Sequence, residues 1–458
     1  MTTNNAQPAR GTRDFLPADV RRREYVTGIV RGVYERYGFE PLETPAFENI
    51  ETLVGKYGEE GNKLIFKILK RGAEETSGAD LALRYDLTVP LARVVAQYQN
   101  DLPKFFRRYQ IQPVWRADRP ARGRFREFYQ CDIDAIGSTS PVVEADVLAA
   151  VSEVLTRLGF DDFVIRLNHR RALTAMLESA GVPRSLHADA LVALDKLDKI
   201  GVQGVENELR ARGIDEKSTM ACLSFLTGVT SDDPRHPGPL ERLRDFVQRH
   251  SEGPAAVNIL DTIVNLTSGT PAQNRVRIDP SLARGLSYYT GAIMEVAVAD
   301  LAGSLGGGGR YDNLIGMFLG REVPACGFSL GLERIIVVMT GRDMFPASIA
   351  GTAVDAMVAV WNDDARADAL ALASELRRSG LRVEVYPEAD KLGKQFKYAS
   401  SRKIPFVAIV GDDERATGDV ALKDLRRGEQ ERVPRAEAAA RLHARLAADA
   451  LTPTTGTR

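Results

Sequence analysis

Apolar positions near the start of the chain recur with the period of a helix. Val33 and Tyr34 lie three and four residues after Val30, and Tyr37 continues the same spacing, which predicts a helix over 18–37. Runs typical of strands follow at 64–69, 81–85, 109–115 and 126–136. One short helix interrupts them at 88–96, with Thr88 as its expected cap. Strands joined by turns favour an α+β fold: a mostly antiparallel sheet with flanking helices.

The pattern changes after about Arg170. Helical stretches that end at glycines fill 170–273, and strands resume at Ile278 and at 292–298. The segment 170–273 is therefore predicted to be an all-α insertion that interrupts a single sheet domain.

Gly341–Thr352 is rich in Gly, Pro, Ala and Ser and is the best candidate for a linker. Beyond it strands and helices alternate, which predicts a small parallel or mixed α/β domain. Strands are expected at 356–361, 381–386 and 405–410, helices at 364–379 and 391–401, a hairpin near Arg427–Gly428 and a last helix from Arg435. The predicted division is 1–169 and 274–340 for the sheet domain, 170–273 for the insertion, 341–351 for the linker, 352–448 for the α/β domain and 449–458 for a mobile tail.

The composition narrows the class of protein. A length of 458 residues suggests about three domains. Lys and Arg number 61 against 62 Asp and Glu, which excludes a globally basic protein but not a locally basic face. The three cysteines and five histidines are scattered, so no disulfide framework or protein-built metal site is expected. With no signal peptide or membrane-length apolar run, we expect a cytoplasmic protein without membrane contact.

The segment Lys104–Arg126 carries eight basic residues and one acid, a net charge of +7 in a nearly neutral chain. Arginine dominates it, which suits bidentate recognition of phosphate, although a solvated basic face is the alternative. Residues two apart on a strand share a face. One side of the sheet should therefore carry Arg126, Phe128, Gln130, Asp132 and Asp134.

Trp115–Pro120, followed by Gly123–Gln130, resembles motif 2 of the class II aminoacyl-tRNA synthetases, in the form used by the histidyl-tRNA synthetase family. Other segments resemble the family's signatures in the same order: the amino-terminal signature at 10–17, motif 1 at 38–45, the amino-acid-binding loop at 83–88, the histidine signature at 282–291, and motif 3 with its approach at 306–312 and 327–334. The last domain resembles the α/β anticodon-binding domain of the histidine, proline, threonine and glycine enzymes.

The resemblance implies a homodimer, formed through motif 1, that ligates L-histidine to tRNA(His). ATP is the second substrate, with Mg²⁺ held largely by its phosphates. Histidyl-adenylate forms first, and the terminal ribose hydroxyl of the tRNA then attacks it. Negative charge builds on the phosphorus oxygens, so fixed cations there lower the barrier. The resemblance assigns that place, beside the histidine carboxylate, to Arg116 and Arg284.

The remaining roles also come from the resemblance. Adenine should lie between Phe128 and the guanidinium of Arg334, as a cation–π sandwich. Asp118 should meet the adenine edge, and Arg124 should hold the γ-phosphate. The run Gly306–Gly309 lacks the Lys-Ser/Thr of a P-loop and by itself is more typical of a flexible turn; within the family it lets the backbone approach substrate closely.

Selecting histidine is a problem of hydrogen bonding, because a neutral imidazole offers one donor and one acceptor. The resemblance gives this reading to Asp134 and Tyr289. It places the α-ammonium group against Asp86, Thr88 and Gln130, with Tyr288 beside them. A site of this kind rejects analogues that lack the ring nitrogens, because its own polar groups are then left unpaired.

Ser287 departs from the family's pattern, which has aspartate there. The change removes a charge beside Arg284 and favours one alternative, a non-catalytic paralogue such as the synthetase-like regulatory subunit of ATP phosphoribosyltransferase. That relative typically lacks the carboxy-terminal domain and has lost the motif arginines, whereas Arg116, Arg284 and Arg334 are all present here. Another class IIa synthetase conflicts with the histidine signature.

Overall fold

The computed structural model describes residues 6–69, 78–229, 238–283, 288–346, 349 and 352–451. The chain divides into two compact units, one of residues 1–14 and 23–344 and one of residues 15–22 and 345–458. Within the predicted linker, residues 347–348 and 350–351 lie outside the described residues, and so do residues 452–458 of the predicted tail.

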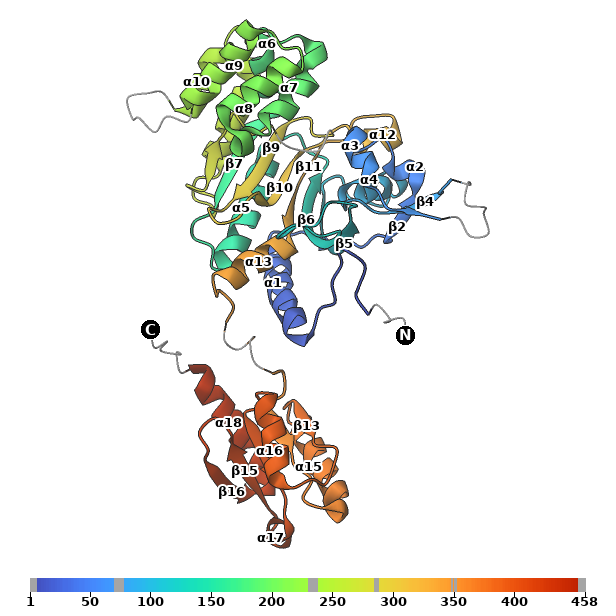
Figure 1. The fold of residues 1–458 in the computed structure, drawn as a ribbon, viewed down its shortest axis with the longest axis vertical. Helices are drawn as coiled ribbons and strands as arrows, with labels where there is room; N and C mark the ends of the chain where they lie inside the picture. Colours follow the sequence, from blue (N-terminus) through green and yellow to red (C-terminus); the bar gives the residue numbers. More distant parts are fainter. Residues whose placement is uncertain are drawn as a thin grey trace. The chain divides into compact units, whose positions relative to one another are not determined.

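The first unit is built on an eight-stranded sheet in the order β1-β5-β6-β11-β10-β9-β7-β8 (Figure 1). Its strands are β1 Glu40–Pro41, β5 Phe106–Trp115, β6 Glu127–Ile136, β7 Val164–His169, β8 Val276–Ile278, β9 Ala292–Ala297, β10 Ser304–Arg310 and β11 Ala325–Gly331. All inner pairs are antiparallel, and the parallel pairs, β1 with β5 and β7 with β8, lie at the two edges. The prediction of a mostly antiparallel sheet is confirmed.

Helices flank this sheet, and the α+β class is confirmed with them. Helix α1 spans Pro17–Arg36, within one residue of the prediction, and buries Val26, Val30, Val33 and Tyr34. Helices α5 (Val142–Arg157) and α13 (Leu332–Gly341) both pack against β6.

The run Gly306–Gly309 forms part of β10 rather than a flexible turn. It pairs with β9 on one side and β11 on the other. A Cβ on Gly308 would lie 2.2 Å from the carbonyl oxygen of Gly327, and one on Gly309 would lie 2.5 Å from that of Ala292. Glycine is therefore required here because neighbouring backbones approach too closely for a side chain.

A three-stranded sheet in the order β2-β4-β3 covers one end of the unit. The elements of this region are β2 Phe47–Asn49, α2 Ile50–Leu53, α3 Gly58–Lys63, β3 Lys67–Ile68, β4 Leu81–Leu83, α4 Thr88–Gln97 and α12 Gly316–Leu319. The prediction of Thr88 as the cap of α4 is wrong, because Leu87 is the N-cap residue and contributes no side-chain bond. The Asp86 carboxylate instead accepts a hydrogen bond from the Val89 nitrogen at 3.0 Å.

Helices fill the described part of the predicted insertion. They are α6 Arg170–Ser179, η1 Arg184–Leu186, α7 His187–Leu194, α8 Leu197–Ala211, α9 Glu216–Val229, α10 Pro239–Val247 and α11 Gly253–Leu266. The segment leaves the sheet after β7 and returns at β8, and these two strands pair in parallel. Because residues 23–344 form one compact unit, a separate domain with bounds at 170 and 273 stays a prediction.

The second unit contains a five-stranded mixed sheet in the order β13-β12-β14-β15-β16. Its elements are β12 Ala356–Val358, η2 Asp363–Ala365, α15 Arg366–Arg378, β13 Val383–Val385, α16 Leu392–Ser401, β14 Phe406–Ile409, α17 Asp412–Thr417, β15 Asp419–Asp424, β16 Gln430–Pro434, η3 Arg435–Glu437 and α18 Ala438–Leu451. The alternation of strands and helices and the hairpin near Arg427–Gly428 are confirmed, while the short helix α17 was not predicted.

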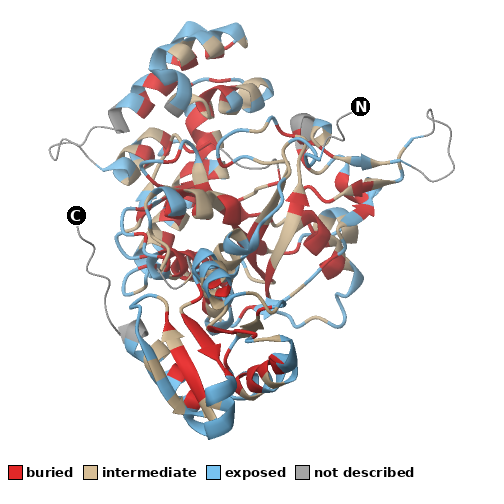
Figure 2. Ribbon diagram, turned by 60° about the horizontal axis from the view of Figure 1, so that its bottom comes forward, coloured by how far each residue is buried: buried red, intermediate tan, exposed pale blue. Residues whose placement is uncertain are grey.

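Buried residues gather on the strands of the eight-stranded and five-stranded sheets, and the outer faces of the helices are exposed (Figure 2). In the second unit, separate apolar clusters lie on the two faces of the sheet. Among the described residues no helix combines the length and apolar character needed to cross a membrane.

Candidate functional site

A row of polar residues faces inward where β5 and β6 pair. The register sets Arg108 opposite Asp134, Gln110 opposite Asp132 and Gln112 opposite Gln130. Strand β11 extends the same face, with Ser329 opposite Asp132 and Gly327 opposite Asp134. The polar face predicted for β6 therefore continues onto β5 and β11, which the sequence pattern did not predict.

Asp86 lies buried at the end of β4, just before α4. Its Oδ1 accepts hydrogen bonds from the Tyr57 hydroxyl and the Val89 nitrogen, each at 3.0 Å. Its Oδ2 accepts one from the Tyr288 hydroxyl at 3.2 Å. Burial raises the pKa of Asp86, and these hydrogen bonds and the Arg116 charge oppose the rise. The structure therefore brings Asp86 and Tyr288 together, as expected, and adds Tyr57, for which no role was predicted.

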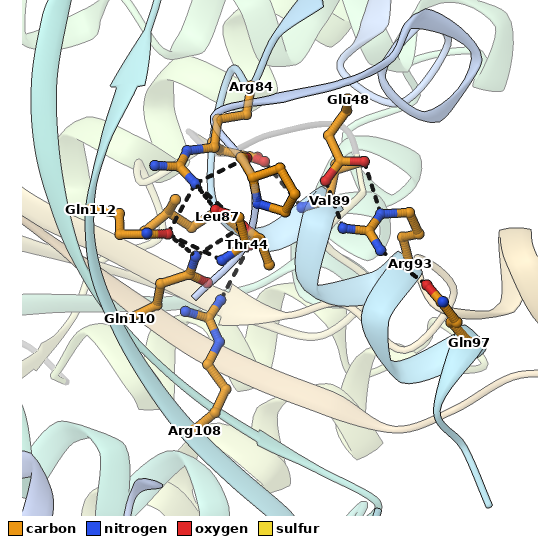
Figure 3. A network of polar contacts seen from close by, with 12 residues as sticks. Thr44, Glu48, Arg84, Leu87, Val89, Arg93, Gln97, Arg108, Gln110 and Gln112 are labelled. Carbon is orange, nitrogen blue, oxygen red and sulfur yellow. Dashed lines mark hydrogen bonds and ion pairs between the residues drawn. The ribbon is translucent and has the colours of Figure 1, made fainter. Parts of the chain in front are cut away.

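Arg84, two residues earlier, fixes this loop through its own network (Figure 3). Its guanidinium, buried with its residue 2% exposed, donates to the carbonyl oxygens of Thr44, Pro45 and Pro113 and to Gln112 Oε1. Burial lowers the pKa of Arg84 to about 10, so it stays charged at neutral pH. The cation joins the segment that resembles motif 1 to β5 and to the loop that carries Asp86.

Arg116 follows the last residue of β5 and turns toward the same loop. Its Nε donates to the carbonyl oxygen of Tyr85 at 3.0 Å. Its guanidinium carbon lies 4.2 Å from the centre of the Tyr85 ring and 5.1 Å from that of Phe128. Arg116 therefore lies between the loop of Asp86 and Phe128, the side chain expected to contact adenine.

Asp118 and Arg124, to which different contacts with ATP are assigned, form an ion pair of 2.8 Å in this structure. The Asp118 carboxylate is largely buried, while the Arg124 side chain is about half exposed. Arg126 donates to the Asp118 carbonyl oxygen at 3.1 Å. The turn between them is closed by two hydrogen bonds that join the backbones of Ala121 and Arg124.

Arg334 lies in the first turn of α13. Its Nη1 donates to the carbonyl oxygen of Ser304 at 2.6 Å, and its Nε donates to that of Gly123 at 3.4 Å. Strand β11, which leads into α13, pairs with β6, so helix α13 with Arg334 begins beside the strand that carries Phe128. The contact of Phe128 given above is with Arg116, so the sandwich with Arg334 stays a prediction.

Gln130 and Asp132 lie deep in the polar face. Gln130 Nε2 donates to the Ser329 hydroxyl at 2.7 Å. Burial and the Asp134 charge raise the pKa of Asp132 to about 7, against the attraction of Arg108. Gln130 Oε1 and Asp132 Oδ1 have no hydrogen-bond partner among the described residues. Buried polar atoms of this kind call for water or a ligand.

Asp134 has a close polar neighbour at each of its oxygens, one through a hydrogen bond and the other through an ion pair. Tyr311 donates its hydroxyl to Oδ1, and Arg108 Nη2 lies 2.8 Å from Oδ2. Burial raises the pKa of Asp134, and Arg108 and Tyr311 oppose the rise. A Cβ on Gly327 would lie 1.9 Å from Oδ1, so only glycine leaves room for this carboxylate.

Tyr288 and Tyr289 pack edge to face, with ring centres 5.1 Å apart. Tyr289 lies over Gly309, where a Cβ would come within 2.9 Å of its ring. Arg284 and Ser287, which precede them, lie outside the described residues. The structure thus places the second half of the histidine signature beside Asp86, and Thr88 starts the adjacent helix.

The segment Lys104–Arg126, with a net charge of +7, is partly neutralised by ion pairs in the folded protein. Arg107 pairs with Asp146 and Arg108 with Asp134, while Arg124 pairs with Asp118. Arg116, in the same segment, contacts a carbonyl oxygen and two aromatic rings. Two of these cations, Arg107 and Arg108, therefore pair with carboxylates outside the segment, and Arg124 pairs with the segment's own acid.

Comparison with known proteins agrees with this geometry. The family model described as histidyl-tRNA synthetase matches residues 11–335, and an anticodon binding domain matches residues 355–445. A histidine–tRNA ligase of Porphyromonas gingivalis is 42% identical over 93% of this chain and 96% of its own length.

The chain belongs to the histidyl-tRNA synthetase family.

Solved structures bear out the fold of this family member. A histidyl-tRNA synthetase from Nostoc sp. aligns with a TM-score of 0.79 and 33% identity, over 97% of this chain and 100% of the other. A Bacillus halodurans structure titled as an ATP phosphoribosyltransferase regulatory subunit/histidyl-tRNA synthetase aligns with a TM-score of 0.72 and 21% identity, which shows the fold alone.

Residues from three of the histidyl-tRNA synthetase signatures meet in the first unit: Asp86 accepts a hydrogen bond from Tyr288, and Arg116 donates one to the Tyr85 carbonyl oxygen. Several side chains of this site had no predicted role, namely Tyr57, Arg84, Arg108, Tyr311 and Glu333. One signal was available for Arg108, because polar residues recur at every second position in 108–112, on an otherwise apolar strand.

Proposed function

We propose that the chain is a histidine–tRNA ligase that activates L-histidine with ATP to histidyl-adenylate and transfers histidine to the 3′ end of tRNA(His). The observation that carries the proposal is the convergence of Asp86 and Arg116, joined through Tyr85, within a chain that matches the family over most of its length. Use of ATP follows from membership of an aminoacyl-tRNA ligase family.

The α-ammonium group of histidine binds at Asp86, Thr88 and Gln130. An ionised carboxylate offers about four lone-pair sites, and Asp86 uses three of them. One site on Oδ2 remains for an ammonium proton. The unpaired Gln130 Oε1 is a second acceptor for the same group.

The imidazole is read by Asp134 and Tyr289. Asp134 accepts the proton of one ring nitrogen, and the Tyr289 hydroxyl donates to the other. Both side chains are set by close packing against glycines, Gly327 and Gly309. This rigidity makes a ring without matching nitrogens costly to bind.

Activation takes place beside Arg116, with Arg284 as the second cation. A histidine carboxylate oxygen attacks the α-phosphorus of ATP, and the bond to pyrophosphate breaks. Both arginines stabilise the charge on the phosphorus oxygens. Phe128 and Arg334 hold adenine, Asp118 meets its edge, and Arg124 leaves Asp118 to reach the γ-phosphate.

We propose that ATP binds together with Mg²⁺, held mainly by the phosphate oxygens. In the part of the chain that the structure describes, no three His, Cys, Asp or Glu side chains are arranged to hold a metal ion. The ion would reduce the repulsion between the phosphates and an incoming carboxylate.

In the second step the terminal ribose hydroxyl of tRNA(His) attacks the carbonyl carbon of the adenylate, and AMP leaves. The turn at Arg119–Gly123 is proposed to contact the acceptor end. The second unit is proposed to bind the anticodon, since its residues 355–445 match an anticodon binding domain. A cytoplasmic homodimer through 38–45 completes the proposal.

Pyrophosphate exchange into ATP, driven by each amino acid in turn, tests the function. Exchange with histidine alone is the expected result, and exchange with none would refute it in favour of the regulatory paralogue. That alternative has less support, because the motif arginines and the last domain are present.

Two variants test the part of the histidine signature outside the described residues. Arg284→Ala should nearly eliminate exchange while the fold persists, and near-normal exchange would remove Arg284 from the reaction centre. Ser287→Asp restores the residue usual in the family and should raise or preserve the rate if the charge supports Arg284.

A further inference from the structure

Arg108 lies on β5 with no exposed surface, between the two segments that are proposed to bind histidine. Its Nη2 is 2.8 Å from Asp134 Oδ2 and donates to the carbonyl oxygen of Leu87 at 3.3 Å. Figure 3 shows the contact with Leu87, which separates Asp86 from Thr88. One guanidinium therefore contacts both the imidazole side and the ammonium side of the proposed pocket.

Burying a cation at this position does not by itself stabilise the folded protein. Its Nε and Nη1 have no hydrogen-bond partner among the described residues. An ion pair taken out of water is seldom more stable than apolar residues of the same volume. An arginine here is better explained by what it does for the carboxylate beside it.

To accept a proton from an imidazole nitrogen, the Asp134 carboxylate must be ionised and must point toward the ring. Burial raises the pKa of Asp134 and so favours the neutral acid, which would present a proton instead of a lone pair. The attraction of Arg108 opposes that rise. Tyr311 donates a hydrogen bond to the second oxygen, while Arg108 acts on Oδ2 as an ion-pair partner at 2.8 Å, because Oδ2 has no hydrogen-bond partner among the described residues.

We propose that Arg108 is a positioning residue for histidine selection: it orients the Asp134 carboxylate and ties it to the loop of Asp86, without touching the substrate. The inference rests on the proposed function and deepens it. A pocket held at two ends by one rigid, planar group keeps the acceptors for the ring and the ammonium group at a set separation.

Arg108→Met is the first test, with histidine-driven pyrophosphate exchange as the assay. We expect the KM for histidine to rise by about tenfold or more, while the KM for ATP stays within about twofold. Arg108→Lys keeps the charge but has no planar fork, so it should recover only part of the loss. Arg107→Met is the matched control, because Arg107 is the neighbouring residue, points to the other face and pairs with Asp146.

A double-mutant cycle separates positioning from general damage to the fold. If Arg108 acts through Asp134, replacing it in an Asp134→Asn background should change the KM for histidine by less than about threefold. Tyr311→Phe removes the hydrogen bond to the other Asp134 oxygen. It should also raise the KM for histidine more than the KM for ATP.

Three results would overturn the inference: equal rises in both KM values, full additivity with Asp134→Asn, or an unchanged KM for histidine in Arg108→Lys and Arg108→Met alike. If the methionine variant does not fold, the lysine variant and the cycle built on it decide alone. Failure of the wild-type protein to exchange with histidine would instead refute the proposed function, so the two failures are distinguishable.

Discussion

Glu333 Oε2 accepts a hydrogen bond from the backbone nitrogen of Tyr129 at 2.9 Å, which ties the first turn of α13 to β6. Its Oε1 lies 2.8 Å from Arg23 Nη1 of α1, and the residue is 3% exposed. Phe128 and Arg334 directly adjoin this bond in sequence. The carboxylate therefore sets how far apart the two proposed walls of the adenine site stand.

Glu333→Gln should weaken the binding of ATP more than the binding of histidine. The amide is the same size but loses the ion pair with Arg23 and presents donors to it. We expect the KM for ATP to rise by about tenfold and the KM for histidine to stay within about threefold, measured by pyrophosphate exchange. Glu153→Gln on α5, which affects a partly exposed pair with Arg36, is the control and should change neither value. A selective effect on histidine would contradict this role.

Gly327→Ala should displace Asp134, because the added Cβ would lie 1.9 Å from Oδ1 and 2.7 Å from the Ile133 carbonyl oxygen. We expect a loss of about 1–3 kcal/mol in the free energy of unfolding and a higher KM for histidine. Gly28→Ala on α1 meets open space and should stabilise the helix by up to about 1 kcal/mol without affecting either KM. An unchanged KM for histidine in Gly327→Ala would show that Asp134 does not read the substrate.

Arg84→Met should leave several buried acceptors without a donor, among them the carbonyl oxygens of Thr44 and Pro113. Each such group costs about 1–3 kcal/mol, so the first unit should unfold at markedly lower urea. Arg84→Lys should recover little, because one ammonium cannot reach all the acceptors. Urea unfolding followed by tryptophan fluorescence in a Trp361→Phe background reports on Trp115, which lies at the end of β5 in the first unit. A variant as stable as the wild type would refute the network.

Asp132 should make the protein less stable as the pH rises. Its pKa is about 7 in the folded protein, against an ordinary value of 3.8, so the folded state holds the proton more tightly. Below pH 4 the group is protonated in both states, and between pH 4 and 7 the unfolded state ionises first, which lowers stability.

The variant Asp132→Asn has no ionisable group at this position. Its free energy of unfolding, relative to that of the wild type, should therefore increase from pH 4 to pH 8. The expected change exceeds about 1.4 kcal/mol, the value of one pKa unit. The same fluorescence assay at a series of pH values measures it. A difference that is flat with pH would mean that Asp132 is ionised throughout.

The amino-acid sequence determined the family and many of the elements, but not the short helix α17 or the cap of α4. The helix at 17–36 follows from the spacing of apolar residues, because it buries one face that repeats with the period of a helix. Strands β5 and β6 follow from runs of residues typical of strands, and both bury residues on both faces along part of their length. The ordered signatures from 10–17 to 327–334 identified a histidyl-tRNA synthetase, and the match at residues 11–335 agrees. The polar alternation in 126–134 also showed which side chains share a face.

Only the tertiary structure decided which groups meet across elements. Tyr311 reaches Asp134 from 177 residues away, Tyr288 reaches Asp86 from 202, and Arg108 was one cation among eight until the register of β5 set it opposite Asp134. Periodicity tells which face a residue occupies but carries no information about the partner on another strand. Pairing depends on strand register and on glycines such as Gly327, whose missing side chain makes the space that the carboxylate fills.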